Sequence, residues 1–254
     1  MVAKPVTDRQ PDPVEAWFAS PLGQYLLFRE QSYFDQAVSD LFGFNAVQLG
    51  LPRVDFLRNS RMPQRLACAA QPGGALRAEP AHLPFDAQSL DLLLLPHVLE
   101  FSANPHQVLR EAERVLRPEG RLLLSGFNPR SLWGVTRVVR GEEGGYPWNG
   151  SFLNVSRVKD WMALLGLEVA AGSMCCYRPP VNQDKWLRRL RFMEPAGDRW
   201  WAMGGGVYFL QAVKRVQGMN VILPAWKKPV AARLFAPAAR KVVNLDQYRN
   251  ERDS

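Results

Sequence analysis

Apolar residues in the first forty positions recur at intervals that are mostly helical. Between Val14 and Phe42 these residues are Trp17, Phe18, Leu22, Tyr25, Leu26, Phe34, Val38 and Leu41. This spacing places apolar side chains on one face of a helix. The tetrapeptide SPLG, which begins at Ser20, has the composition of a helix start and predicts that a second helix opens there. We therefore expect two helices before the first strand.

Short, nearly continuous apolar runs dominate the middle of the chain. Five of them follow in order: NAVQLGL, RLACAA, ALRAE, SLDLLLLPHV and GRLLLSGF. Such runs are typical of parallel strands that are covered on both faces. Three further stretches predict a helix followed by a strand, a basic amphipathic helix and a last strand; they are SRVKDWMALLGLEVAAGSMCC, DKWLRRLRFM and GGGVYFLQAVKRV. The prediction is therefore a seven-stranded sheet.

The connection between the fourth and fifth runs has clear helix signals. Asn104 is a suitable N-cap, and Pro105 suits the first helical position because its missing N–H group has no partner there in any case. Pro118 is expected to end the helix and Gly120 to turn the chain into the next strand. One apolar stripe is formed by Val108, Leu109, Ala112, Val115 and Leu116. The pattern predicts a right-handed βαβ unit.

These elements predict an α/β fold of the Rossmann-like type, in which a mostly parallel seven-stranded sheet carries helices on both faces. Residues 1–44 form the helical segment and residues 45–216 the α/β domain. Residues 217–254 are rich in Pro, Ala and basic residues, which predicts a partly disordered tail.

Composition narrows the class of protein. The 254 residues are 47% hydrophobic and 22% charged, which is typical of a globular protein and excludes a disordered or fibrous chain. No apolar run approaches the ~20 residues that cross a bilayer, and the N-terminus lacks the apolar core of a signal peptide, so we expect a cytoplasmic protein. Cys68, Cys175 and Cys176 are too few for a disulfide framework and form no metal-binding pattern, which predicts buried, reduced thiols.

Positive charge is concentrated at the C-terminus. The formal net charge is +8, and from Lys214 to Ser254 nine Lys or Arg residues face three Asp or Glu residues. A basic tail favours nucleic acid, anionic lipid or an acidic protein partner, but it is equally compatible with a solvated arm. Both readings stay open.

The stretch from Ala78 to Pro129 carries a specific order of landmarks. An acid precedes LPF, the strand SLDLLLL and PHVLE follow, and a helix ends in LRPEG before the next strand. This order resembles the class I S-adenosylmethionine-dependent methyltransferases, in particular the type 11 methyltransferase domain. QLG in place of DLG, with the two preceding helices, is similar to a divergent bacterial branch. The resemblance implies S-adenosylmethionine as cofactor, a small-molecule methyl acceptor and a methyltransferase-like domain over residues 45–216.

The resemblance also implies roles for individual residues. Glu79 would face the adenine amino group, although a surface glutamate without a role is the plain alternative. Asp91, which opens a strand, is expected to be a structural carboxylate. The positions that match cofactor-binding sites of the family are Gln48, Gly50, Arg53, Gln71, Glu79, Ala81, His82, Leu83 and His97. Of these, Ala81, His82 and Leu83 would contribute backbone donors around the adenine.

Two groups of candidates concern the reaction itself. His97 follows the fourth strand, where an imidazole would look into the cofactor cleft and act as a general base. A histidine that is buried, satisfied and merely shapes the pocket is the alternative. Asn128, Arg130 and Trp133 follow the fifth strand, where members of the family meet their substrate, and we expect at least one of them to contact it.

The first strand departs from the family pattern. Only Gly50 remains of the glycine-rich turn, while Leu51 and Pro52 fill space that the cofactor needs, and Arg53 would compensate by pairing with the methionine carboxylate. The second strand ends without the acid that accepts the ribose hydroxyls, and Gln71 would form a weaker neutral hydrogen bond. Together these changes predict an affinity lower by about a hundredfold or more.

Two hypotheses of function therefore stand side by side. The first is an active methyltransferase whose acceptor is anionic if the basic residues near Arg188 line the cleft, and whose lid is aromatic; the lid residues would be Trp133, Tyr146, Trp148, Trp186, Trp200 and Trp201. The second is a catalytically inactive methyltransferase-like module that binds RNA or an acidic partner through its basic tail.

Overall fold

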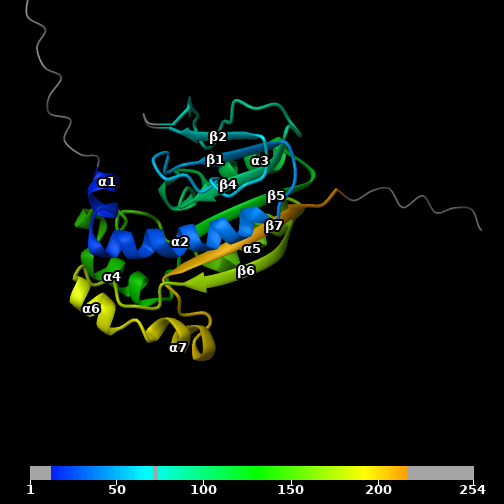
Figure 1. Ribbon diagram of the computed structural model, residues 1–254. Coiled ribbons are helices and arrows are strands. Elements are labelled where there is room, and N and C mark those ends of the chain that lie inside the picture. The colour runs from blue at the N-terminus through cyan, green and yellow to red at the C-terminus, as the bar shows by residue number, and fades with distance from the viewer. Residues whose placement is uncertain (1–12, 71–73, 217–254) are drawn as a thin grey trace, which may run out of the picture. The chain divides into compact units, whose positions relative to one another are not determined.

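The computed structural model describes residues 13–70 and 74–216, all of which belong to the first of the two units of the chain, Met1–Val216. Seven strands form one sheet in the order β3-β2-β1-β4-β5-β7-β6 (Figure 1). They are β1 Asn45–Leu49, β2 Gln64–Ala69, β3 Leu76–Arg77, β4 Leu90–Pro96, β5 Leu116–Phe127, β6 Leu167–Cys175 and β7 Val207–Lys214. Strand β7 is antiparallel to β5 and β6, and the other pairs are parallel. The predicted α/β class and the mostly parallel sheet are confirmed.

Helices cover both faces of this sheet (Figure 1). They are α1 Pro13–Phe18, α2 Pro21–Ser39, α3 Pro105–Val115, α4 Leu132–Arg140, α5 Val155–Leu164, α6 Asp184–Arg189 and α7 Met193–Trp200. Two 3₁₀ turns are Leu99–Phe101 and Glu142–Gly144. No helix among the described residues is long and apolar enough to cross a membrane. The basic tail, residues 217–254, lies outside the described residues.

Alternate side chains of β4 point to opposite faces of the sheet and into two separate cores. Leu93 and Leu95 point into the core that α3 and α5 cover, whereas Leu92 and Leu94 point into the core that α2 covers. All four side chains are fully buried, as a central parallel strand requires. Phe34 of α2 lies in the same core as Leu94. The N-terminal helices are therefore packed onto the sheet and do not form a separate core.

Asp91 fastens the amino end of the sheet, in agreement with its expected structural role. Its carboxylate accepts the backbone N–H groups of Phe44 at 2.8 Å and Asn45 at 2.9 Å, and Arg117 donates to its other oxygen at 3.1 Å. Burial raises the pKa of Asp91, but these donors outweigh the effect and hold the pKa below its usual value. The carboxylate therefore stays charged and fixes the start of β1 against β4.

The crossover from β4 to β5 begins as its sequence predicts and ends earlier. The Asn104 side chain accepts the Gln107 N–H group at 3.2 Å, and Pro105 occupies the first turn. The helix ends at Val115 rather than at Pro118, because Leu116 is already extended with φ −72° and ψ 139°. A residue before proline avoids the helical region, so the chain leaves the helix before it reaches Pro118.

Two helices escaped the sequence-based prediction. Helix α4 begins directly after Ser131, whose hydroxyl accepts the Gly134 N–H group at 3.2 Å. The predicted basic helix is also shorter than expected, because α6 ends at Arg189 and a separate helix, α7, starts at Met193. Both segments are short, and short helices depend on tertiary packing more than on their own periodicity.

Removal of the α3 cap tests how much the crossover depends on local signals. We expect Asn104→Ala to lower the free energy of unfolding by about 1 kcal/mol, because one N-terminal N–H group loses its acceptor. Asn104→Ser, which keeps a capping oxygen, should stay within about 0.5 kcal/mol of the wild type. Urea unfolding followed by circular dichroism measures both, and equal loss in the two variants would contradict the capping role.

Candidate functional site

The parallel pairing brings the ends of several strands to one edge of the sheet. Strands β1, β4 and β5 end there at Leu49, Pro96 and Phe127, and Glu79 follows the end of β3. In open α/β sheets, ligands bind outside this edge. The residues that the sequence singled out therefore do gather where a ligand is expected, and the question is what each side chain does there.

Gln48 holds the loop that follows β1. Its amide nitrogen lies 3.2 Å from the Gly50 carbonyl, 3.1 Å from that of Leu51 and 2.7 Å from that of Val54, and its amide oxygen accepts the Phe56 N–H group at 3.0 Å. The side chain is buried and all its polar atoms are engaged within the protein. The Gln48 side chain therefore shapes the loop from inside, and Gln48 as a cofactor-binding position stays a prediction.

The loop is compact where the family has its glycines. Gly50 has φ 86°, and a Cβ atom there would lie 3.0 Å from Val98 and 3.4 Å from the Pro96 carbonyl. Leu51 also has a positive φ, 45°, and its side chain packs against the core beneath α2. Only a residue without a side chain fits at Gly50, so this position still allows close approach to the end of β4.

Arg53 is paired with another residue of the protein in this structure. Its guanidinium forms an ion pair with Glu15 of α1 and is largely exposed to solvent. This surface pair joins the loop to the N-terminal helix, and the pairing of Arg53 with the methionine carboxylate stays a prediction. Surface ion pairs of this kind contribute little to stability.

In the loop after β3, two of the predicted backbone donors form hydrogen bonds within the protein. The His82 N–H group donates to the Glu79 carbonyl at 2.9 Å, and the Leu83 N–H group donates to Glu111 of α3 at 3.0 Å. Arg114 donates to the same carboxylate at 2.8 Å and holds the pKa of Glu111 below its usual value. His82 and Leu83 are therefore not the free adenine donors that the resemblance implies, whereas the Glu79 side chain is exposed.

The end of β2 has no acid among its described residues. Cys68 and Ala69 are buried there, and Gln71 falls within residues 71–73, outside the described part of the chain. Ala81 is half-buried in the loop beside Glu79. Ala81 and Glu79 thus remain as predicted adenine contacts, and Gln71 remains a prediction.

His97 is locked between two carboxylates. Its Nε2 atom lies 2.7 Å from Glu30 of α2, and its Nδ1 atom lies 3.0 Å from Glu100. The ring stacks on Phe127 with centroids 4.0 Å apart, and the side chain is 1% exposed. Burial alone lowers the pKa of His97, but Glu30 and Glu100 outweigh it and raise the pKa to about 10. An imidazole that keeps its proton at neutral pH is not a general base, so the structure favours the satisfied, structural alternative.

The cluster of Glu30, His97 and Glu100 contains more acidic than basic groups. Two carboxylates face one imidazolium, and Glu30 and His97 meet as charges without the alignment of a hydrogen bond. Several buried oxygens around the cluster have no hydrogen-bond partner among the described residues; they belong to Glu30, Glu100, Ser125, Tyr146 and Tyr208. Buried oxygens without partners are costly, so the site favours a polar or cationic group that completes them.

Sequence reasoning missed Glu30, although a signal exists. Leu26, Glu30 and Phe34 are spaced four residues apart on α2, and all three are fully buried. A single carboxylate inside an apolar helical stripe predicts a buried charged partner elsewhere in the fold. Only the folded structure identifies His97 as that partner.

The candidates after β5 are mostly structural. The Asn128 amide donates to the carbonyls of Met203 and Gly205, both at 2.9 Å, and the Trp133 indole donates to the Arg178 carbonyl at 3.0 Å. Asn128 and Trp133 are buried, so neither presents its polar group to a substrate as expected. Arg130 is exposed and remains the substrate contact that the sequence predicts.

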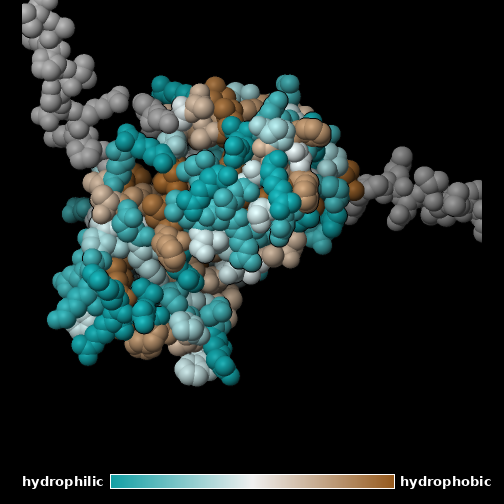
Figure 2. All heavy atoms as spheres, viewed as in Figure 1, coloured by the Kyte–Doolittle hydropathy of each residue, from teal (hydrophilic) through white to brown (hydrophobic). Residues whose placement is uncertain are grey.

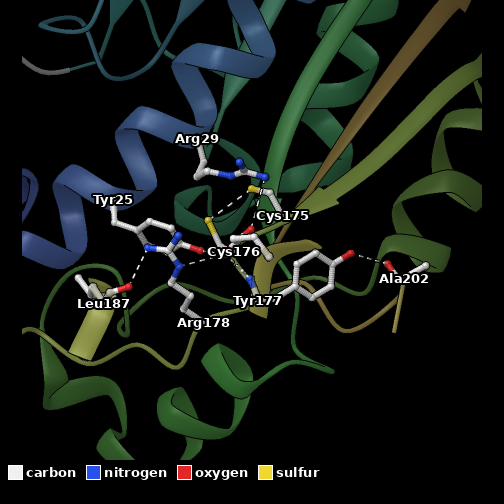
Figure 3. A network of polar contacts seen from close by, with 9 residues as sticks. Tyr25, Arg29, Cys175, Cys176, Tyr177, Arg178, Leu187 and Ala202 are labelled. Atoms are coloured by element: carbon white, nitrogen blue, oxygen red, sulfur yellow. Dashed lines mark hydrogen bonds and ion pairs between the residues drawn. The ribbon is translucent and has the colours of Figure 1, made fainter. Parts of the chain in front are cut away.

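A second polar network joins α2 to α7 on the same side of the sheet (Figure 3). Glu194 of α7 is buried; its carboxylate accepts the Tyr25 hydroxyl and the Tyr177 N–H group, and it pairs with Arg29 at 3.4 Å. The network fixes α7 against α2. Cys176 is buried beside it, and burial raises the pKa of this thiol well above its ordinary value, so the thiol is protonated rather than nucleophilic.

The expected aromatic lid does not form over the sheet edge. Trp133 and Trp148 are buried in the core, whereas Trp186, Trp200 and Trp201 are exposed. One cavity of about 240 Å³ lies between α4 and α7, and another of about 350 Å³ lies at the opposite edge of the sheet. Neither cavity is lined by the ends of β1 or β4. Among the described residues, no group of three or more His, Cys, Asp or Glu is placed to hold a metal ion.

Comparisons with known proteins agree on the fold. Residues 54–124 match the family model of a methyltransferase domain. The structure resembles an S-adenosylmethionine-dependent methyltransferase of Thermotoga maritima with a TM-score of 0.59, at 19% identity, over 79% of this chain and 94% of the other. A methyltransferase from the complex with the Haloferax volcanii activator Trm112 gives 0.57 at 16% identity, over 84% of this chain and 100% of the other. The [4+2]-cyclase SpnF gives 0.52 at 16% identity, over 74% and 80%.

Similarity in sequence extends to shorter segments. The uncharacterized protein YafS of Escherichia coli is 42% identical over 98 residues, which is 39% of this chain and 41% of YafS. The uncharacterized protein MJ1123 of Methanocaldococcus jannaschii is 25% identical over 103 residues, which is 41% of this chain and 50% of MJ1123. The chain thus spans half or less of the curated relatives it matches.

The His97 cluster predicts how stability varies with pH. The pKa of His97 rises from about 6.5 in the unfolded chain to about 10 in the folded protein. Its stabilisation is therefore complete below pH ~6.5 and is lost as the pH rises towards 10, by at most about 1.4 kcal/mol per pH unit. Urea unfolding from pH 6 to pH 10 should show this fall in the wild type, and His97→Gln should be less stable at pH 6 by a margin that narrows with pH.

The matched control for this experiment is His82→Gln, because His82 is exposed and lies outside the cluster. It should keep the wild-type pH dependence. A margin between the wild type and His97→Gln that stays constant from pH 6 to pH 10 would contradict a protonated His97.

Proposed function

We propose that the protein transfers a methyl group from S-adenosylmethionine to a small molecule. The chain has the class I S-adenosylmethionine-dependent methyltransferase fold and matches the methyltransferase domain. The observation that carries the proposal is the position of the match. Residues 54–124 include the Glu79–Leu83 loop and the end of β4, which lie at the edge where open α/β sheets bind ligands. The [4+2]-cyclase SpnF has a similar fold, so the fold alone does not determine the reaction.

The residues present fit parts of the cofactor. Gly50 has a positive φ and lies against the end of β4, and the exposed Glu79 is available to the adenine amino group. The excess negative charge of Glu30 and Glu100 over His97 favours a cation at this edge, and the sulfonium of S-adenosylmethionine is a cation. No described acid serves the ribose, and Arg53 is paired elsewhere, so we expect weak binding.

The cofactor, when bound, supplies an electrophilic methyl group, and the chain supplies position and exclusion of water. His97 is protonated and buried, so it removes no proton from the acceptor. We therefore propose an acceptor atom that is nucleophilic at neutral pH without a general base. Arg130, which is exposed directly after β5, supports an anionic acceptor.

The cysteines support a proposed compartment. All three thiols are free and buried, which suits a reducing environment, and we place the activity in the cytoplasm.

Titration calorimetry with S-adenosylmethionine and S-adenosylhomocysteine tests the proposal. We expect binding in the micromolar range, and Glu79→Gln should weaken it by about tenfold because the adenine loses a charged acceptor. Asp160→Asn is the matched control: Asp160 is an exposed carboxylate on α5, far along the chain from the strand ends, and its variant should bind like the wild type.

One result would overturn the proposal, and another would overturn the role of Glu79. Absence of heat and of thermal stabilisation at millimolar ligand would exclude a working cofactor site and favour the inactive module. Equal binding by the wild type and Glu79→Gln would remove Glu79 from the site.

A further inference from the structure

Helix α4 has an unusual exposed face. Val135, Val138 and Val139 are 60%, 77% and 81% exposed, although valine is ordinarily buried. Leu132 opens the same helix, and Leu132, Val135 and Val139 are spaced three and four residues apart, so they line one side of it. Such a contiguous apolar side indicates a surface that meets something other than water.

This face continues onto the segment from Asp184 to Met203. Leu132 lines the 240 Å³ cavity together with Phe192, Trp200 and Trp201, so the α4 face and the α7 segment adjoin. The large exposed hydrophobic side chains of this segment are Trp186, Phe192, Trp200, Trp201 and Met203. We call α4 and residues 184–203 together the aromatic–basic face.

Charge distinguishes this face from an ordinary protein interface. Residues 184–203 carry five exposed basic side chains and two exposed acidic ones, Asp184 and Asp198; the basic ones are Lys185, Arg188, Arg189, Arg191 and Arg199. Figure 2 shows hydrophilic and hydrophobic residues side by side at the lower end of the view, where α6 and α7 lie. The third acid, Glu194, is buried against Tyr25 and Arg29 and adds no negative charge to the surface.

The inward contacts of Glu194 also make the face rigid. Because α7 is anchored to α2 on its inner side, its outer side carries Trp200, 80% exposed, in a fixed position. Arg191 and Arg199 flank α7 at its two ends. Tryptophan prefers the boundary between headgroups and acyl chains, while long basic side chains reach the phosphates above it.

We propose that the aromatic–basic face docks the protein onto an anionic phospholipid bilayer, with the tryptophans and valines in the interface and the basic side chains on the headgroups. Charge complementarity selects this occupant, since juxtamembrane basic residues are each stabilised by anionic lipid. RNA is disfavoured because bases stack on aromatic rings, whereas the three valines of α4 offer no stacking surface and no hydrogen bond. The proposal is independent of methyl transfer.

Vesicle flotation with the full chain tests this docking. We expect binding to mixed phosphatidylcholine–phosphatidylglycerol vesicles, little binding to phosphatidylcholine alone, and a loss at high salt. The double variant Arg191→Gln, Arg199→Gln and the single variant Trp200→Ser should each bind at least about tenfold more weakly. Thermal unfolding of each variant should match the wild type, because these side chains are exposed.

Matched controls come from α5, which also carries exposed residues of both kinds. Leu164 is 86% exposed, and Lys159 is exposed nearby. Leu164→Ser and Lys159→Gln should bind vesicles like the wild type.

Depth of insertion localises the contact. Brominated phospholipid should quench the tryptophan fluorescence of the wild type, and Trp200→Phe, Trp201→Phe should lose most of this quenching while it still binds. Vesicle binding that the face variants leave unchanged would assign it to another part of the chain, such as the basic tail, and overturn the proposal. Binding of RNA but not of vesicles, or equal binding to neutral and anionic vesicles, would overturn it as well.

Discussion

The contact between His97 and Glu30 holds the site together. It joins the end of β4 to a helix that lies more than sixty residues earlier in the chain, and Glu100 completes the link by accepting the Phe127 N–H group at 2.7 Å at the end of β5. Without an imidazolium between them, two carboxylates would face each other in the core, which is strongly unfavourable. The proton on His97 therefore helps to hold α2 over the strand ends, beside the apolar contacts of Leu26 and Phe34.

That constraint shapes the chemistry. A histidine that keeps its proton is not free to accept another, so the methyl transfer that we propose would rest on positioning and on the acidic groups of the cluster. The same edge has exchanged the glycine-rich turn for a loop held by Gln48 and by the core packing of Leu51. Contacts of Gly50 in this loop, and of Glu79 after β3, to a cofactor stay predictions.

Local signals predicted what local forces determine. The seven strands followed from apolar runs, and the α3 start followed from Asn104 and Pro105, because strand burial and helix capping act within a few residues. The hydrogen bonds of Gln48 and Asn128 did not follow, since both side chains are occupied by partners that only the tertiary fold brings near. For His97 the sequence offered a buried, satisfied histidine as one alternative, but it did not identify Glu30 as the partner.

The central claim is that His97 is a fixed imidazolium, and nuclear magnetic resonance of ¹⁵N-labelled imidazole nitrogens tests it most directly. At pH 8 we predict that Nδ1 and Nε2 of His97 both carry a proton, with chemical shifts that stay constant from pH 6 to pH 8. A His97 ring that is neutral at pH 8, or whose shifts change between pH 6 and pH 8, would contradict the account.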